Sequence, residues 1–561
     1  MEEVHTLREV IRYASACYRG MTAFRYKTGR KETETKSYED LAHDTAAVSR
    51  AIEALGLSGK HIALLGTTSY AWIVCYFGIA NSGSVAVPLD AQLSKETLTE
   101  LLNRADVSAL FYDAAYEDTA EAAKKACPGI SVYTVFHKAE ADGAALGRMG
   151  AAADTKETSG TAESKTAAAK AASLETAENT ERTGVQPGKN DGENGAPSSY
   201  RCEELPDLLR RCAGAYNKSI APDKLCTILF TSGTTGKSKG VMLTHRNLTD
   251  NAVCLDMKIP AGTVSMTLLP INHVYCLTMD IIKGLFIGLE ICINDSIMHV
   301  QKNLKLFRPQ IMLVVPMVLE SIYAKMEDAG RLLPKKLVAH EVFGGRLKTI
   351  CSGGAYLDPV YVDRFQEYGI TVLQGYGMTE NAPVVSTNLE WANRKGSVGK
   401  LLPNCEAKIE DEEIWVRGTS VMQGYYKMPE ETKETLTPDG WLKTGDLGYL
   451  DADGYLYITG RRKNLIILAN GENVSPEELE NLLYKNRLVK EAVVREKDRI
   501  IEAEIFPDEE LAKKKHIKDL QKALEDAVLE CNQALPSYKR ISRVLLRTEE
   551  FPKTTTRKIK R

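Results

Sequence analysis

Residues 229–248 read LFTSGTTGKSKGVMLTHRNL and place a polar, glycine-rich run between an apolar stretch and a helix-like pattern. The tripeptide GKS at 236–238 resembles the end of the P-loop pattern G-x-x-x-x-G-K-[ST], but Thr231 stands where the first glycine is required. The spacing therefore does not fit a P-loop. Flexible glycines, hydroxyl groups and the positive charges of Lys237 and Lys239 still suit a triphosphate, and a solvated turn is the alternative.

Strand-like and helix-like segments alternate along most of the chain. Amphipathic segments such as PVYVDRFQEYG at 359–369 separate short apolar runs. These runs lie at 60–68, 84–90, 107–113, 225–233, 309–316, 347–354 and 370–377. This alternation predicts an α/β fold with parallel-type sheets flanked by helices in a large N-terminal domain, residues 1–459. Shorter strands and charged helices then predict a small C-terminal α+β domain over 460–561. Ligands of parallel sheets bind at the carboxyl ends of the strands, where several of these runs become glycine-rich.

Composition narrows the classes of function. A net charge of -3 argues against a protein that coats nucleic acid, so we expect small-molecule partners. Twelve cysteines are scattered without a C-x-x-C pair, so zinc, iron–sulfur and secreted-disulfide frameworks lack support. The N-terminus has no signal-peptide pattern, and polar residues interrupt the apolar runs at 62–88 and 266–293. We therefore expect a cytoplasmic protein without a transmembrane segment, for which peripheral membrane contact stays open.

Residues 139–199 differ in composition from the rest of the chain. They are rich in Ala, Gly, Thr and charged residues and contain almost no aromatic or β-branched apolar side chains. Such a segment cannot bury enough apolar surface to offset its conformational entropy. The composition therefore predicts a disordered insertion within the large domain.

Five motifs in order give the sequence its strongest family resemblance. They are the run at 229–248, SGGAYL at 352–357, QGYGMTE at 374–380, GWLKTGDLGYLDADGYLYITGRRKNLIILANGENVSPEELE at 440–480, and FPKTTTRKIKR at 551–561. Outside the predicted insertion, nearly the whole chain resembles the adenylate-forming superfamily of acyl-CoA synthetases, firefly luciferases and peptide-synthetase adenylation domains. The resemblance implies that ATP, as cosubstrate, and Mg2+ activate a carboxylic acid through an acyl-AMP intermediate. It also implies that a thiol then takes the acyl group.

The resemblance assigns the nucleotide-binding residues of the large domain. It implies that a loop surrounds the β- and γ-phosphates of ATP with Thr231, Ser232, Gly233, Thr234, Thr235 and Lys239. In QGYGMTE, Tyr376 matches the aromatic residue that stacks on adenine against the backbone of Gly354 and Ala355. The opening run is therefore interpreted as a phosphate cradle.

Four further positions match the residues around the ribose, the phosphates and the metal. The resemblance implies that Thr379 offers a hydroxyl to phosphate and that Glu380 serves Mg2+, an ion that oxygen ligands suit. It implies that Asp446 accepts both ribose hydroxyls and that Arg461 lies near ribose and phosphate. Alternatively, Asp446 only caps a turn, and Arg461 belongs to a solvated basic linker, GRRKN.

The small domain carries the remaining matches. Lys463 stands at the family's hinge, about which this domain moves between an adenylating and a thioester-forming pose. Gly471 matches a glycine that borders the pantetheine tunnel, and Lys558 matches the lysine of the closing motif. Arg557 replaces the usual glycine before that lysine, which puts the placement of Lys558 in doubt because Arg does not readily adopt a positive φ. The alternative for this basic terminus is a disordered tail.

Two positions bear on the acid. Gly377 stands where acetate-specific relatives carry a Trp that closes the acyl pocket, so we expect a deeper pocket for a medium- or long-chain fatty acid. His273 matches a pocket-gating position, although a buried core histidine is equally compatible. CoA is the expected acceptor; an acyl-acyl carrier protein synthetase or fatty acyl-AMP ligase, and a non-catalytic adenylate-binding protein, are the alternatives.

Overall fold

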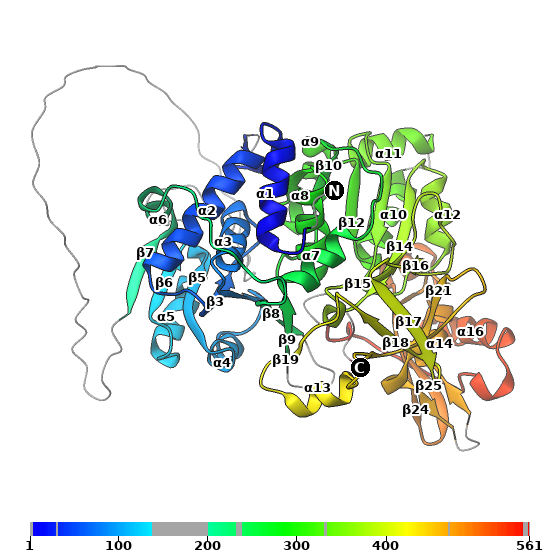
Figure 1. Ribbon diagram of the computed structural model, residues 1–561. Coiled ribbons are helices and arrows are strands. Elements are labelled where there is room, and N and C mark those ends of the chain that lie inside the picture. The colour runs from blue at the N-terminus through cyan, green and yellow to red at the C-terminus, as the bar shows by residue number, and fades with distance from the viewer. Residues whose placement is uncertain are drawn as a thin grey trace, which may run out of the picture.

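The coordinates are a computed structural model that describes residues 4–29, 32–136, 200–231, 238–329, 334–468, 472–553, 559 and 561 (Figure 1). Two large sheets dominate it, with the eight-stranded sheet on the left of Figure 1 and the nine-stranded sheet on the right. Among the described residues, no helix combines the length and the apolar character that a bilayer span needs. The predicted insertion at 139–199 lies outside the described residues.

The eight-stranded sheet carries the opening motif. Its strands in spatial order are β19 (Gly424–Tyr425), β9 (Lys239–Thr244), β8 (Leu225–Thr231), β4 (Val85–Leu89), β3 (His61–Leu65), β5 (Val107–Tyr112), β6 (Val132–Val135) and β7 (Arg201–Glu204). Pairing is parallel from β8 to β7 but antiparallel between β8 and β9. The sequence pattern led us to expect a helix directly after the polar run, and this was wrong. Alternating burial along KGVMLT forms strand β9 first, and helix α7 (His245–Val253) follows.

The nine-stranded sheet supplies the other wall of the site. Its strands in spatial order are β16 (Lys400–Leu401), β15 (Val384–Thr387), β14 (Thr371–Gly377), β13 (Thr349–Ser352), β12 (Ile311–Val314), β10 (Val264–Thr267), β11 (Glu290–Ile293), β1 (Thr22–Lys27) and β2 (Thr33–Ser37). Strands β14 to β1 pair in parallel, and antiparallel strands close both edges. The carboxyl ends of β13 and β14 therefore lie side by side, as the glycine-rich motifs predicted.

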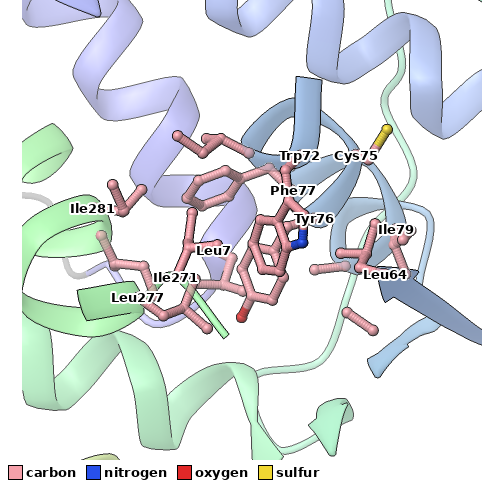
Figure 2. Packing of buried hydrophobic residues seen from close by; sticks show 14 of the residues in the cluster. Leu7, Leu64, Trp72, Cys75, Tyr76, Phe77, Ile79, Ile271, Leu277 and Ile281 are labelled. Atoms are coloured by element: carbon pink, nitrogen blue, oxygen red, sulfur yellow. The ribbon is translucent and has the colours of Figure 1, made fainter. Parts of the chain in front are cut away.

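Helices packed between the two sheets form the main core. They are α1 (Leu7–Tyr18), α2 (Tyr38–Ala54), α3 (Tyr70–Asn81), α7, the π-helical segment η2 (Cys276–Ile282) and α8 (Lys283–Phe286). Helix α3 begins at its cap Ser69 and is buried on nearly every side, which fits its almost uniformly apolar sequence. Figure 2 shows Trp72 and Tyr76 of α3 beside Leu7 of α1 and Leu277 of η2. This packing fixes the position of η2 relative to both sheets.

Further helices cover the outer faces of the large sheets. They are η1 (Ala114–Tyr116), α4 (Lys95–Arg104), α5 (Glu117–Ala126), η3 (Ile297–His299), α9 (Val300–Phe307), α10 (Pro316–Ala329), α11 (Lys335–Phe343) and α12 (Val360–Gln366). Helix α6 (Leu205–Arg211) instead packs against α2, and α13 (Pro429–Thr435) lies beside the edge strand β19. Two apolar clusters lie beneath the outer helices, one against each sheet. Each large sheet is thus covered on both faces, as expected for parallel strands.

A four-stranded antiparallel sheet precedes the C-terminal region. It consists of β17 (Cys405–Glu410), β18 (Glu413–Gly418), β20 (Leu442–Leu450) and β21 (Leu456–Arg461). The C-terminal region follows with η5 (Arg462–Asn464), β22 (Ile466–Ile467), β23 (Asn473–Val474), α14 (Pro476–Leu483), β24 (Val489–Lys497), β25 (Ile500–Pro507), α15 (Glu509–Lys514), α16 (Leu520–Gln533), η6 (Ser537–Lys539) and β26 (Arg543–Leu546). It has a separate apolar core. The large α/β part and the smaller C-terminal part confirm the predicted fold class.

Candidate active site

One cavity connects the predicted site residues. It has a volume of about 2900 Å³ and is walled by both large sheets, helix η2 and the C-terminal region. The predicted residues that line it are Thr231, Lys239, His273, Gly354, Ala355, Tyr376, Gly377, Thr379, Glu380, Arg461 and Lys463. Ser232, Gly233, Thr234, Thr235, Gly471 and Lys558 lie outside the described residues. Segments far apart in the sequence therefore meet at one place.

Asp446 is held by two residues on opposite sides. The hydroxyl of Tyr376 donates a 2.6 Å hydrogen bond to Oδ2 of Asp446, and Nε of Arg461 lies 2.8 Å from Oδ1. Strand pairing sets this geometry, because Asp446 of β20 faces Arg461 of β21 in register. Desolvation and the charge of Asp446 raise the pKa of the Tyr376 hydroxyl well above its usual value, so Tyr376 remains a donor. The carboxylate of Asp446 is buried behind Tyr376 and Arg461, which line the cavity, and Asp446 itself is not among the lining residues.

Two glycines show why small residues are needed beside Tyr376. Gly354 has a φ of +83°, in the left-handed region that favours glycine. A Cβ on Gly377 would lie 2.1 Å from the carbonyl oxygen of Pro383. The Gly377 position therefore has no room for a Trp unless the backbone moves, and the absence of a side chain here follows from the close approach of β14 to residues 383–384. Gly377 cannot by itself measure the depth of the acyl pocket.

A second chain of contacts joins Lys239 to Glu380. The Lys239 ammonium lies 4.5 Å from the centre of the Tyr425 ring, and the Tyr425 hydroxyl donates a 2.9 Å hydrogen bond to Oε1 of Glu380. Burial, followed by the charge of Glu380, raises the pKa of Tyr425 and keeps the hydroxyl protonated. The sequence interpretation missed Tyr425, which lies in GYYKMP at 424–429, between the motifs at 374–380 and 440–480. Its strand, β19, pairs with β9 and so brings it to the phosphate-cradle side.

The donor chemistry around Glu380 fits Mg2+. Glu380 and Thr379 occupy the short helix η4 (Thr379–Asn381) and offer carboxylate and hydroxyl oxygens to the cavity. Within the described part of the chain, no cluster of three or more His, Cys, Asp and Glu side chains could hold a metal alone. Magnesium usually takes one or two carboxylates and completes its shell with water and substrate phosphates. A single carboxylate beside a phosphate site is therefore an adequate protein contribution.

The residues before the predicted hinge are anchored to the four-stranded sheet. Nη1 of Arg462 lies 2.6 Å from Oε2 of the buried Glu413, and the backbone N–H of Gly445 donates to Oε1 of Glu413 at 2.8 Å. Arg461 is held by Asp446 as described. Lys463 is the next residue, and Asn464 contacts Glu477 of α14 in the C-terminal region. The chain thus passes from one folded unit to the other at Lys463, although its role as a hinge remains a prediction.

His273 precedes the helical segment that includes η2. It is half-buried and lines the cavity, and its backbone carbonyl accepts the N–H of Leu277 at 3.0 Å. The same cavity is also lined by the apolar residues Met257, Ile259, Leu289 and Leu313. His273 is therefore part of the cavity lining, and its role as a pocket-gating residue stays a prediction.

Comparison with known families covers both parts of the chain. Residues 11–426 match the model described as AMP-binding enzyme, and residues 463–561 match the model described as AMP-binding enzyme C-terminal domain. The boundary between the two matches lies close to the passage at Lys463.

Curated relatives are about one third identical to this chain. It is 33% identical over 380 residues to a 4-coumarate–CoA ligase-like protein of Oryza sativa subsp. japonica, covering 64% of each chain. It is 31% identical over 391 residues to a chloroplastic long-chain-fatty-acid–[acyl-carrier-protein] ligase of Arabidopsis thaliana, covering 53% of each. It is 34% identical over 291 residues to a long-chain-fatty-acid–CoA ligase of Bacillus subtilis, covering 48% of this chain and 50% of that one. The matches thus span about half to two thirds of these relatives.

Solved structures share the fold at low sequence identity. An anthranilate CoA ligase in complex with anthranoyl-AMP aligns with a TM-score of 0.77 and 19% identity, over 100% of this chain and 96% of the other. An O-succinylbenzoate coenzyme A synthetase from Bacillus subtilis in complex with AMP aligns with a TM-score of 0.72 and 22% identity, over 98% and 97%. These similarities establish the overall architecture.

Proposed function

The chain belongs to the AMP-binding enzyme family, and we propose that it uses ATP to activate a carboxylic acid as an acyl-adenylate and then passes the acyl group to CoA. The observation that carries the proposal is a cavity lined by two polar clusters. In the first, Tyr376 and Arg461 line the cavity and both contact the buried Asp446 behind them. The second consists of Glu380, Tyr425 and Lys239. The first cluster suits a ribose and the second a set of phosphates. A family scaffold without these side chains would favour a non-catalytic binding protein.

The first half-reaction requires positioning more than a covalent catalyst. A carboxylate oxygen attacks the α-phosphorus, the bond to the bridging oxygen breaks, and pyrophosphate leaves. Glu380, with Thr379 nearby, would hold Mg2+, which would supply charge neutralisation at the phosphates. Asp446 and Tyr376 hold the nucleoside, while Lys239 stands at the base of the loop that would cradle the β- and γ-phosphates. Lys558 is assigned to the α-phosphate by family resemblance alone.

In the second half-reaction, a thiol reacts with the acyl carbon of the acyl-adenylate. The sulfur of CoA attacks the acyl carbon, the bond to the AMP oxygen breaks, and AMP leaves. Because the residues on both sides of Lys463 are anchored to different folded units, rotation about this residue would exchange the surfaces facing the cavity. Gly471 would then border the thiol path, as family resemblance implies.

A medium- or long-chain fatty acid is the proposed substrate class. The cavity continues beyond the nucleotide clusters between η2 and the nine-stranded sheet, where Met257, Ile259, Leu289 and Leu313 line it. Apolar walls of this extent suit a hydrocarbon chain or ring. The printed names of the curated relatives include both long-chain fatty acid ligases and 4-coumarate–CoA ligase-like proteins, so they support an apolar acid without fixing its shape.

A carrier protein is the second candidate acceptor, because a similar curated protein is named as an acyl-carrier-protein ligase. The basic stretch that would meet an acidic carrier is residues 539–561, and several of its described basic residues are paired within the chain. Lys539 bonds Glu478, Arg547 bonds Glu504, and Lys553 bonds Glu550. Internal neutralisation of these charges favours CoA as the acceptor.

The test is acid-dependent pyrophosphate release, measured with a panel of carboxylic acids and with CoA or holo-carrier protein as acceptor. We expect medium- and long-chain acids to exceed acetate, and CoA to yield the thioester. Release that does not depend on any acid, or thioester formed on the carrier alone, would refute the corresponding part of the proposal.

A further inference from the structure

Helix η2 presents two chemically different faces. Leu277 and Ile281 point into the main core, close to Leu7 and Ile271 in Figure 2. Met279, Asp280 and Lys283 instead line the cavity that extends from the nucleotide clusters. The π-helical turn changes the angular spacing of side chains relative to an α-helix, and such turns are frequent at functional sites. A polar strip therefore lies on a wall that is otherwise mainly apolar.

Apart from the Cys276 thiol, Asp280 has no hydrogen-bond partner among the described residues. Its side chain belongs to a residue that is 1% exposed, and both carboxyl oxygens are buried. The Cys276 thiol, one turn earlier, contributes to its surroundings, but a thiol is a weak donor. Burial raises the pKa of Asp280 well above its usual value, so the carboxyl group is neutral and can both donate and accept.

Lys283, the first residue of α8 directly after η2, has hydrogen-bond partners for its buried side chain. Its Nζ donates to the backbone carbonyl of Ala252 at 2.9 Å and to that of Leu255 at 2.7 Å. Those carbonyls stand at and just beyond the C-terminal end of α7, so Lys283 has a structural task there. Within the described residues, the Asp280 carboxyl group makes no comparable hydrogen bond to the backbone.

A second unsatisfied group lines the same cavity. Ser265 of β10 is 1% exposed, and its hydroxyl oxygen is buried without a partner in the described part of the chain. Buried polar groups in folded proteins are normally hydrogen-bonded, so two exceptions lining one cavity point to a missing ligand group. A charged ligand group is a poorer fit than a neutral one, because burial disfavours charge on this wall: it raises the pKa of Asp280 and lowers the pKa of Lys283.

We infer that the acid activated by this protein carries a hydroxyl group on its hydrocarbon part, and that Asp280, together with Ser265, binds this hydroxyl and selects the substrate. The inference rests on the proposed function and narrows its substrate class. A hydroxyl can accept from the Asp280 carboxyl and donate to Ser265, or the reverse. Sites built to bond a substrate hydroxyl discriminate strongly against the analogue that lacks it, because their buried polar groups are then left unpaired.

Binding of matched acid pairs tests the inference without requiring turnover. Calorimetric titrations of the full chain compare decanoic acid with its ω-hydroxy derivative and cinnamic acid with its para-hydroxy derivative. We expect the hydroxy member of at least one pair to bind at least tenfold more tightly. Asp280→Leu should remove this difference, Asp280→Asn should retain part of it, and Met279→Leu, a neighbouring apolar change on the same wall, should leave it intact.

Stability separates a specificity residue from a structural one. Without ligand, Asp280→Leu should raise the melting temperature, because it replaces an unpaired buried carboxyl group with an apolar one. Equal affinity for both members of each pair, or a lower melting temperature together with equal loss of affinity for both members, would overturn the inference. AMP formation with the same acids distinguishes the two proposals. Preference that depends on Asp280 without AMP formation refutes the activity, whereas AMP formation without preference refutes only the role of Asp280.

Discussion

The hydroxyl of Tyr376 donates a 2.6 Å hydrogen bond to one carboxylate oxygen of Asp446, while Arg461 binds the other oxygen at 2.8 Å. This relationship joins β14 of the nine-stranded sheet to β20 and β21, immediately before Lys463. It holds Asp446, the residue proposed to bind the ribose, in one orientation before the nucleotide binds. Pre-positioned groups of this kind reduce the entropy lost on binding.

Replacing Tyr376 with Phe should weaken ATP binding. The buried Asp446 would lose a donor while the aromatic ring remains, which amounts to about 1–2 kcal/mol, or roughly a 5- to 30-fold rise in KM for ATP. Steady-state kinetics should show little change in KM for the acid. The matched control is Tyr449→Phe. Tyr449 is an exposed tyrosine on β20, the strand that carries Asp446. An unchanged KM for ATP would separate Tyr376 from the nucleotide site.

Replacing Glu380 with Gln should raise the Mg2+ concentration needed for half-maximal rate by about tenfold or more, because a neutral amide is a poor magnesium ligand. The measurement is a Mg2+ titration of AMP formation at saturating ATP and acid. Glu430→Gln changes an exposed carboxylate that pairs with Lys433 on α13, and it should leave the titration unchanged. The same Mg2+ dependence in both variants would contradict the role of Glu380.

His245 should make the folded protein sensitive to acid. It is buried at the first turn of α7, and its Nδ1 accepts the N–H of Leu7 at 3.4 Å. Burial lowers the pKa of His245 from 6.5 to about 3. Between these values the unfolded chain binds a proton that the folded protein does not, so stability falls as pH falls, by about 1.4 kcal/mol per pH unit at most.

Denaturant unfolding between pH 7 and pH 5 measures this contribution. We expect the pH slope to be smaller for His245→Gln than for the unmodified protein, even where the variant is less stable at pH 7. His43→Gln, which alters an exposed histidine of α2, should keep the original slope. Identical slopes in all three proteins would assign the acid sensitivity to other groups.

Deleting residues 143–196 and closing the gap with a short Gly/Ser linker should leave the melting temperature and the turnover nearly unchanged, because their composition cannot supply a core. Strands β6 and β7 on either side pair in parallel, with Tyr133 opposite Cys202. The new connection must therefore run back along a strand, about 13 Å for four residues. Residues 137–142 and 197–199 remain and can span this distance. A large loss of folded protein would show that the deleted residues pack.

The sequence was sufficient for the fold class, and several residues of its motifs lie together along one cavity, while their roles stay predictions. Tyr376 and Glu380 line the cavity because parallel strands end at one edge of the nine-stranded sheet and the motif follows the end of β14. Arg461 joins them from the end of β21 in the antiparallel four-stranded sheet. Contacts made through side-chain direction were not predictable in the same way. Tyr425 reaches Glu380 only because β19 pairs with β9, across many intervening residues.

Local backbone geometry explains the remaining differences. The strand β9 was not predicted from the sequence, because the periodicity of a short apolar run next to a helix does not distinguish a strand from a helical segment. The requirement for glycine at 377 comes from the neighbouring Pro383 carbonyl oxygen, which no periodicity of the sequence reveals. Asp280 lies in an apolar helical run, LTMDIIKGLF, and its lack of a described partner other than the Cys276 thiol is visible only in three dimensions.

Acid-dependent exchange of labelled pyrophosphate into ATP tests the central claim most directly, because it reports reversible acyl-adenylate formation without any thiol acceptor. We predict exchange that requires both Mg2+ and a carboxylic acid. Lys558→Ala should reduce it by about a hundred- to a thousand-fold, the loss of one transition-state donor, while transfer from prepared acyl-AMP to CoA continues. Exchange without acid, or no exchange with any acid of the panel, would contradict the assignment of this protein as an acid-activating enzyme.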